Sequence, residues 1–183
     1  MARLIHLNGA PGIGKSTLAR RYAEDHPGIL VCDIDVLRTL VAGWQEDFHE
    51  AGTRIRTTAL ATITSYLQSG HDVVLPQFVA RAEELARFRS AAARGEAQYV
   101  GVVLTAEPRV VIDRFRTRSV IESDDPLVAA ISEVVEGLGG ADVIAGSCTD
   151  LDVLADQEQL LRVPSTAPEE TYGALLLALG ERR

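Results

Sequence analysis

One stretch near the start of the sequence limits the possible folds more than any other. Residues 9–16 satisfy the pattern G-x-x-x-x-G-K-[ST] at every required position. An apolar run at residues 3–7 precedes them, and a helical pattern follows. Glycines let such a loop curl until successive backbone N–H groups point inward, and the helix adds the positive end of its dipole. The sequence therefore predicts a strand, a phosphate-binding loop and a helix.

The side chains of this loop suit a nucleoside triphosphate with its magnesium ion. We expect Lys15 to reach the β- and γ-phosphates, the Ser16 hydroxyl to coordinate Mg²⁺, and Thr17 to support the phosphate contacts. A glycine-rich turn that binds nothing is the alternative, but the three glycines and both flanking elements together favour nucleotide binding. The predicted ATP-binding residues are Gly9, Ala10, Pro11, Gly12, Ile13, Gly14, Lys15, Ser16 and Thr17.

Length, charge and cysteine content narrow the class of protein. The 183 residues, of which 46% are hydrophobic, suffice for one domain with a single core. A formal net charge of −8 argues against a broad basic face for nucleic acid. Two cysteines are too few for a disulfide framework, nothing resembles a signal peptide, and no apolar run reaches the roughly 18 residues of a membrane span. These features predict a cytoplasmic protein without a membrane partner.

Short apolar runs alternate with helical patterns along the chain. This alternation predicts an α/β fold, a three-layer α/β/α arrangement around a five-stranded parallel sheet, in a single domain of residues 1–183. A short helical lid is expected at about residues 115–146. The predicted strands are residues 3–7, 29–32, 72–75, 99–104 and 159–163. Five predicted helices span residues 36–44, 47–68, 82–94, 126–138 and 169–179. Two more begin near residue 15 and near residue 109.

Two aspartates follow the second predicted strand, at the edge of the sheet where ligands of such folds lie. Asp33 and Asp35 are two residues apart, so in extended backbone their side chains point the same way. Phosphoryl transfer to a hydroxyl group needs one carboxylate to accept the proton and another to hold the metal, and we assign these roles to Asp35 and Asp33 respectively. Alternatively, either aspartate caps the helix predicted to begin at Val36.

Several arginines are candidates for binding anionic groups. Arg38 lies one helical turn after Asp35 and is either a residue that holds an anionic or hydroxyl-rich acceptor or a solvated helix arginine. Arg114, Arg116 and Arg118 precede an irregular acidic segment, as expected of a flap that brings arginine onto the transferring phosphoryl group, or of a charged helix face. We favour Arg114 and Arg118, which share a helix face.

Other polar residues receive weaker assignments. Gln77 ends the third predicted strand, where many phosphate-loop enzymes have a carboxylate for the metal shell, and we place it beside the acceptor. Either Asp33 alone fills that metal role, or the protein binds nucleotide with little turnover. Arg54 and Arg56 either line an acceptor pocket or are solvated, and we favour the solvated interpretation. The histidines, His6 among them, lack metal-ligand spacing and are interpreted as structural or surface residues. Residues 164–168 are placed to wrap an adenine base.

With these residues identified, the chain resembles the small P-loop kinases of the nucleoside monophosphate kinase fold. The likeness is greatest to chloramphenicol phosphotransferase and to polynucleotide 5′-hydroxyl kinase domains, and more distant to shikimate kinases, gluconate kinases and zeta-type toxins. It rests on residues 9–17 and 26–38, whereas residues 119–146 match none of these families closely. The resemblance implies that Asp35 is the catalytic base, that Arg38 contacts the acceptor, and that one arginine of the lid acts on the phosphates.

The sequence thus predicts an ATP- and Mg²⁺-dependent phosphotransferase whose acceptor is a hydroxyl group of a small molecule, such as an antibiotic, a nucleoside, a sugar or a related metabolite. Lys15, Arg114 and Arg118 are the expected charge stabilisers. Two alternatives remain, a polynucleotide 5′-hydroxyl kinase and a nucleotide-binding regulatory protein with little turnover. The sequence lacks the Asn-Lys-x-Asp and Asp-x-x-Gly elements typical of guanine switch proteins.

Overall fold

A single parallel sheet organises the protein, of which the computed structural model describes residues 1–181. Its strand order is β2-β3-β1-β4-β5, so the strand that leads into the phosphate-binding loop lies at the centre. In chain order the elements are β1 (Arg3–Asn8), α1 (Lys15–Asp25), β2 (Leu30–Val31), α2 (Ile34–Arg38), α3 (Phe48–Gln68), β3 (Val73–Pro76), α4 (Ala82–Arg94), β4 (Gln98–Thr105), α5 (Pro108–Ile121), α6 (Pro126–Gly137), α7 (Ala141–Gln157), β5 (Leu161–Pro164) and α8 (Pro168–Ala178).

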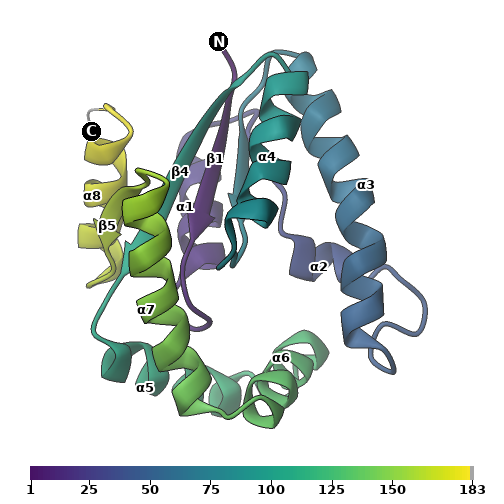
Figure 1. The fold of residues 1–183 in the computed structure, drawn as a ribbon, viewed down its shortest axis with the longest axis vertical. Coiled ribbons are helices and arrows are strands. Elements are labelled where there is room, and N and C mark those ends of the chain that lie inside the picture. Colours follow the sequence, from purple (N-terminus) through teal and green to yellow (C-terminus); the bar gives the residue numbers. More distant parts are fainter. Residues whose placement is uncertain (182–183) are drawn as a thin grey trace.

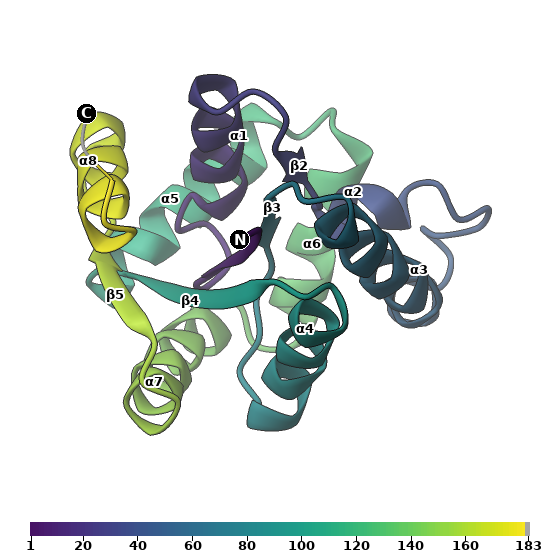
Figure 2. The same ribbon diagram turned by 90° about the horizontal axis from the view of Figure 1, so that it is seen from above.

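Helices cover both faces of the sheet. The crossover from β1 to β2 places α1 on one face of the sheet, beside α8 (Figure 2). The crossovers from β2 to β3, from β3 to β4 and from β4 to β5 run across the sheet in the opposite direction, and they place α3, α4 and α7 on the other face. This division follows from the right-handedness of parallel crossovers. The helices α2, α5 and α6 lie at the end of the sheet toward which the strands run (Figure 1). The predicted three-layer α/β/α fold with five parallel strands is therefore confirmed.

The two central strands are buried along their length because helices lie on both sides of them. Leu4, Ile5 and Leu7 of β1 have no exposed area, and the same is true of Val73 and Val74 of β3. A strand buried on both faces needs an unbroken apolar run rather than an alternating one. This requirement explains why the sequence located these strands to within about two residues.

The second helix differs from its prediction. The sequence placed it at residues 36–44, but α2 spans Ile34–Arg38. It starts earlier because the Asp33 side chain accepts a hydrogen bond from the backbone N–H of Asp35 at 3.1 Å and caps the helix at once. Asp35 is therefore a residue of the first turn and not a cap, and the capping alternative applies to Asp33 alone.

One long helix, α7, has no counterpart among the predicted elements. Its buried side chains include Ile144, Leu151 and Leu154, which have helical spacing. Gly146 and Thr149 stand between them and weaken the apolar pattern that a sequence reading needs. Within residues 1–181, no helix combines the length and the apolar character needed to cross a membrane.

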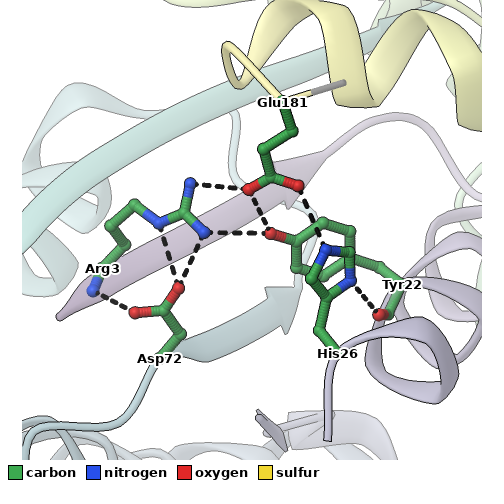
Figure 3. Close-up of polar contacts among 5 residues, drawn as sticks. All are labelled: Arg3, Tyr22, His26, Asp72 and Glu181. Carbon is green, nitrogen blue, oxygen red and sulfur yellow. Dashed lines mark hydrogen bonds and ion pairs between the residues drawn. The ribbon is translucent and has the colours of Figure 1, made fainter. Parts of the chain in front are cut away.

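A polar network ties the two ends of the described chain together, at the amino ends of the strands (Figure 3). Arg3 of β1 contacts Asp72 Oδ2 and Glu181 Oε1, each at 2.8 Å. The Tyr22 hydroxyl of α1 donates to Glu181 Oε1 at 2.7 Å, and His26 Nε2 lies 3.2 Å from Glu181 Oε2. The network therefore joins β1 and α1 to the residues just before β3 and just after α8, at the end of the sheet opposite the candidate site.

Candidate active site

The phosphate loop, residues 9–17, has the conformation that its glycines predict. Gly12 and Gly14 have φ angles of 88° and 104°, in the left-handed region that favours glycine. The Asn8 side chain fixes the start of the loop, because its Oδ1 accepts from the backbone N–H groups of Gly9 at 2.8 Å and Val79 at 2.9 Å. The helix α1 begins directly after Gly14, so its N-terminus points at the loop. The predicted strand, loop and helix are all present.

Lys15 lies inside the curl of the loop. Its Nζ donates to the backbone carbonyl oxygens of Gly9 at 2.8 Å and Ala10 at 3.1 Å. Burial lowers the pKa of Lys15 to about 8, Asp35 and Asp33 oppose this shift, and the charge of Arg118 adds to it. Asp33, Asp35 and Arg118 therefore lie within electrostatic range of Lys15.

Ser16 and Asp33 form the pair expected of a metal site. The Ser16 hydroxyl donates to Asp33 Oδ2 at 2.8 Å, while Asp33 Oδ1 caps α2. The capping interpretation of Asp33 is therefore confirmed, and its metal role stays a prediction. Hydroxyl and carboxylate oxygens are ligands that Mg²⁺ prefers, and a nucleotide-bound Mg²⁺ needs only one or two of them from the protein. Within residues 1–181, no group of three or more His, Cys, Asp or Glu side chains forms a separate metal site.

Asp35 is partly covered, and its charge acts on Lys15 of the loop. Two thirds of its side chain is covered, since 33% is exposed, and Arg38 Nη1 lies 3.0 Å from its Oδ1. Burial raises the pKa of the Asp35 carboxyl, whereas the charges of Arg38 and Lys15 lower it. A carboxylate with this environment suits the role of a proton acceptor next to the cation that is predicted to bind phosphate.

Arg38 is buried, so its interpretation as a solvated helix arginine is wrong. Only 7% of the residue is exposed, and its guanidinium lies over the Phe48 ring at 3.7 Å from the ring centre. Gly52 makes this position possible, because a Cβ atom there would stand 2.7 Å from Arg38 Nη2. The helix α3 therefore provides a flat surface on which the guanidinium rests beside Asp35.

Gln77 is buried at the end of β3, and His6 holds its backbone. His6 Nε2 lies 2.8 Å from the Gln77 carbonyl oxygen and Nδ1 lies 2.8 Å from the Tyr99 hydroxyl. A carbonyl only accepts, so Nε2 carries the proton and the Tyr99 hydroxyl donates to Nδ1. Burial lowers the pKa of His6 to about 4, which keeps it neutral and structural, as expected. The buried Gln77 Oε1 has no hydrogen-bond partner within residues 1–181.

The structure places the arginines of α5 in different surroundings. Arg114 donates to Ser165 Oγ at 2.9 Å and to the Thr166 carbonyl at 2.8 Å, and Ser165 Oγ in turn donates to the Ile13 carbonyl at 2.9 Å. Arg114 therefore joins the loop after β5 to the phosphate loop, a contact across 51 residues of sequence that no local pattern could reveal. The exposed Arg118 pairs with Glu122 at 2.9 Å.

A cavity of about 550 Å³ adjoins the phosphate loop. Its volume falls in the range of small-molecule sites. The loop after β5 forms one wall, and the phosphate loop and α1 form others. That residues 164–168 wrap an adenine base stays a prediction. The lining residues include Gly12, Gly14, Thr17, Leu18, Arg21, Arg114, Ser165, Thr166 and Pro168.

Replacing Gly12 by alanine is expected to lower the free energy of unfolding by about 1–3 kcal/mol, because a side chain at its positive φ is strained. The new Cβ would also lie 2.7 Å from Phe115 Cβ and 3.0 Å from the Phe115 backbone. Thermal and urea unfolding measure the change. Gly146→Ala is the matched control, since nothing lies within 4 Å of a Cβ there. Wild-type stability of Gly12→Ala would contradict this packing.

The lid predicted at about residues 115–146 corresponds to the end of α5, all of α6 and the start of α7. The Asp125 side chain caps α6 by accepting from the Leu127 N–H at 2.8 Å. The helix α6 packs on α5 and α7 and lies at the same end of the sheet as α2 (Figure 1). The helix α6 therefore lies at the end of the sheet where the candidate site is. That it closes over the site as a lid stays a prediction.

Comparisons with known proteins agree with this geometry. A family described as an AAA domain matches residues 4–135. A "putative kinase" from Chloroflexus aurantiacus J-10-fl has a similar structure, with a TM-score of 0.66, 16% identity and coverage of 98% of this chain and 94% of that chain. A gluconokinase from Sinorhizobium meliloti 1021 has a TM-score of 0.62 and 18% identity, with coverage of 96% of this chain and 90% of that chain. The tunicamycin resistance protein of Deinococcus radiodurans has a TM-score of 0.58 and 14% identity, with coverage of 99% of this chain and 98% of that chain.

No curated protein matches the chain. The structural similarities establish the fold alone, because the identities are low. The family match covers most of the sequence and includes the phosphate loop, Asp33, Asp35 and Arg38. The chain therefore belongs to the AAA domain family, and its fold is that of the phosphate-loop kinases.

Proposed function

We propose that the protein transfers the γ-phosphoryl group of ATP to a hydroxyl group of a small molecule. One observation supports this most directly. The Asp35 carboxylate lies within electrostatic range of Lys15, the phosphate-binding cation, and of Asp33, which contacts Ser16. A proton acceptor, a cation for the phosphates and a pair of donors for magnesium therefore lie near one another, as transfer to a hydroxyl requires.

The chemistry of the donor set fits magnesium. Ser16 and Asp33 would hold the ion, whose charge, when bound, neutralises the β- and γ-phosphates. The absence of an acidic residue at Gln77 leaves Asp33 as the carboxylate of this set. The base of ATP would occupy the cavity beside the phosphate loop, with Arg114 holding the wall formed by Ser165 and Thr166.

The residues then have separate roles in the transfer. The acceptor oxygen attacks the γ-phosphorus, its proton passes to Asp35, and the bond to the bridging oxygen breaks so that ADP leaves with that electron pair. Lys15 and Arg118 stabilise the charge that develops on the phosphoryl oxygens. Gln77 Oε1, which has no partner within residues 1–181, accepts from a second hydroxyl of the acceptor. Arg114 holds the loop after β5 in place and does not act on the phosphates.

Acceptor-dependent ADP release tests the proposal. Purified protein with ATP and Mg²⁺ is offered nucleosides, sugars, hydroxy acids, antibiotics and 5′-hydroxyl oligonucleotides, and transfer of label from [γ-³²P]ATP identifies the product. Stoichiometric label on a small molecule is the expected result. Label confined to oligonucleotides, with salt-dependent binding, would establish the polynucleotide kinase alternative instead. Tight ATP binding without transfer to any acceptor would favour the regulatory alternative.

A further inference from the structure

We propose that the cavity beside the phosphate loop does not select adenine, and that a purine nucleotide with a 6-keto group binds there at least as tightly as an adenine nucleotide. The inference rests on the proposed kinase function and widens its phosphoryl donor to 6-keto purine nucleoside triphosphates. Arg114 is the residue that determines this selectivity. Its guanidinium lies on the cavity wall and is hydrogen-bonded to the groups that the 6-amino group of adenine would need.

Adenine and the 6-keto purines present opposite hydrogen-bonding patterns at positions 6 and 1. Adenine donates from its 6-amino group and accepts at N1, whereas a 6-keto purine accepts at O6 and donates from N1–H. A cavity that selects adenine therefore needs a free carbonyl for the amino group and a free N–H group for N1. Such a cavity rejects the other base because polar groups of the wall would then lose their partners.

The carbonyl oxygens of the loop after β5 are already bonded to Arg114. Nη1 donates to the Ser165 carbonyl at 3.3 Å and Nη2 donates to the Thr166 carbonyl at 2.8 Å. The Ser165 hydroxyl also accepts from Nη1, at 2.9 Å, and donates to the Ile13 carbonyl at 2.9 Å. A carbonyl oxygen can accept a second hydrogen bond, but the positive charge against both oxygens opposes the partly positive hydrogens of an amino group. The wall therefore offers adenine no good acceptor.

The N–H groups of the same wall are also used. The Ser165 N–H donates to the Thr105 carbonyl at 2.7 Å, and the Thr166 N–H donates to Thr171 Oγ1 at 2.9 Å. Pro168, which also lines the cavity, has no N–H group. Ser165, Thr166 and Pro168 therefore offer no backbone donor to N1 of adenine.

Arg114 keeps a donor that suits a 6-keto group. Its three hydrogen bonds all come from the two Nη atoms, and its Nε–H has no partner within residues 1–181. Guanidinium donors pair readily with O6 of a purine. A keto oxygen is partly negative, so the charge that opposes an amino group attracts it. Leu18 and Pro168 offer apolar contact to either purine, which leaves position 6 as the point of difference.

Nucleoside diphosphates measure this selectivity without turnover. With saturating Mg²⁺, the protein is titrated in a calorimeter with ADP, with IDP and with purine riboside diphosphate, which has no substituent at position 6. We expect IDP to bind at least as tightly as ADP, and purine riboside diphosphate to bind as tightly as ADP. A cavity that held the amino group by a hydrogen bond would instead favour ADP over both by about tenfold.

Three variants separate recognition from structure. Arg114→Met removes the guanidinium and frees both carbonyls, so ADP should become tighter than IDP by about fivefold or more. Arg109→Met removes an exposed arginine of α5 that does not line the cavity, and it should bind both nucleotides as wild type does. Ser165→Ala loosens the loop but keeps the bond to Thr166, so it should weaken both nucleotides equally. A purely structural Arg114 would make Arg114→Met behave like Ser165→Ala.

The inference is overturned if the wild-type protein binds ADP more than about fivefold tighter than IDP or purine riboside diphosphate, or if Arg114→Met leaves the ratio of affinities unchanged. The wild-type comparison decides even where a variant does not fold. The acceptor panel is also assayed with ATP and with ITP as donors. Transfer from ATP alone would retain the kinase function and reject the inference. Equal binding of the diphosphates without transfer from either triphosphate would reject the kinase function and retain the inferred selectivity.

Discussion

Replacing Asp35 by asparagine is expected to reduce phosphoryl transfer by about 10²- to 10⁴-fold, the usual contribution of a general base. Asparagine keeps the shape of the side chain but cannot accept the hydroxyl proton. ATP affinity should change little, because the loop and Lys15 remain in place. Single-turnover transfer and equilibrium ATP binding measure the two effects. Asp150→Asn, on the exposed side of α7, is the matched control.

The pH profile tests the same residue independently. Burial raises the pKa of the Asp35 carboxyl, with Arg38 opposing it, so activity should fall on the acid side at a pH above that expected of an ordinary aspartate. The fall occurs as pH decreases through this raised pKa, since protonated Asp35 cannot accept a proton. Arg38→Gln should move the acid limb to still higher pH. If the acid limb of the pH profile is unchanged in both Arg38→Gln and Asp35→Asn, Asp35 has no part in the mechanism.

Replacing Lys15 by methionine is expected to lower both ATP affinity and phosphoryl transfer, the latter by about 10²- to 10³-fold. Methionine fills the space of the aliphatic stem but supplies neither the charge nor the donors that Nζ now directs at Gly9 and Ala10. Isothermal titration with ATP measures the affinity. Arg116→Met removes an exposed charge of α5 and should behave as wild type.

Lys15 should also make ATP binding pH-dependent. Because burial lowers its pKa to about 8, the ammonium group of the free protein loses its proton as pH rises through that value, and ATP affinity should decline above it. Bound phosphates stabilise the charged form, so the nucleotide complex should keep the proton to higher pH. Affinity that is constant from pH 7 to about 9.5 would contradict this environment.

The features that the sequence predicted well are those determined by short stretches of chain. The phosphate loop follows from its glycines and from Lys15, because each residue acts through its own backbone or side chain. The strands β1 and β3 follow from apolar runs that burial on both faces requires. Asp33 and Asp35 follow β2 at the carboxyl edge of the sheet, but Asp35 lies in a helical turn rather than in extended backbone, and their roles stay predictions.

The features that it missed depend on distant partners. Arg114 was expected at the phosphates, yet its donors go to Ser165 and Thr166. Arg56 was expected in solvent, yet Glu84 of another helix covers it. Neither partner has a fixed spacing in sequence, so only the packing of α5 on the loop after β5, and of α3 on α4, reveals these roles.

The contact of Phe115 with Gly12 joins the phosphate loop to α5 without an intervening side chain. The helix α5 continues through Arg118 toward α6, so a displacement of these helices is transmitted directly to the backbone that grips the nucleotide. A side chain at Gly12 would meet the Cβ atom and the backbone of Phe115, and every residue other than glycine has both. In relatives with this architecture, we therefore expect glycine at the first position whatever side chain stands at the second.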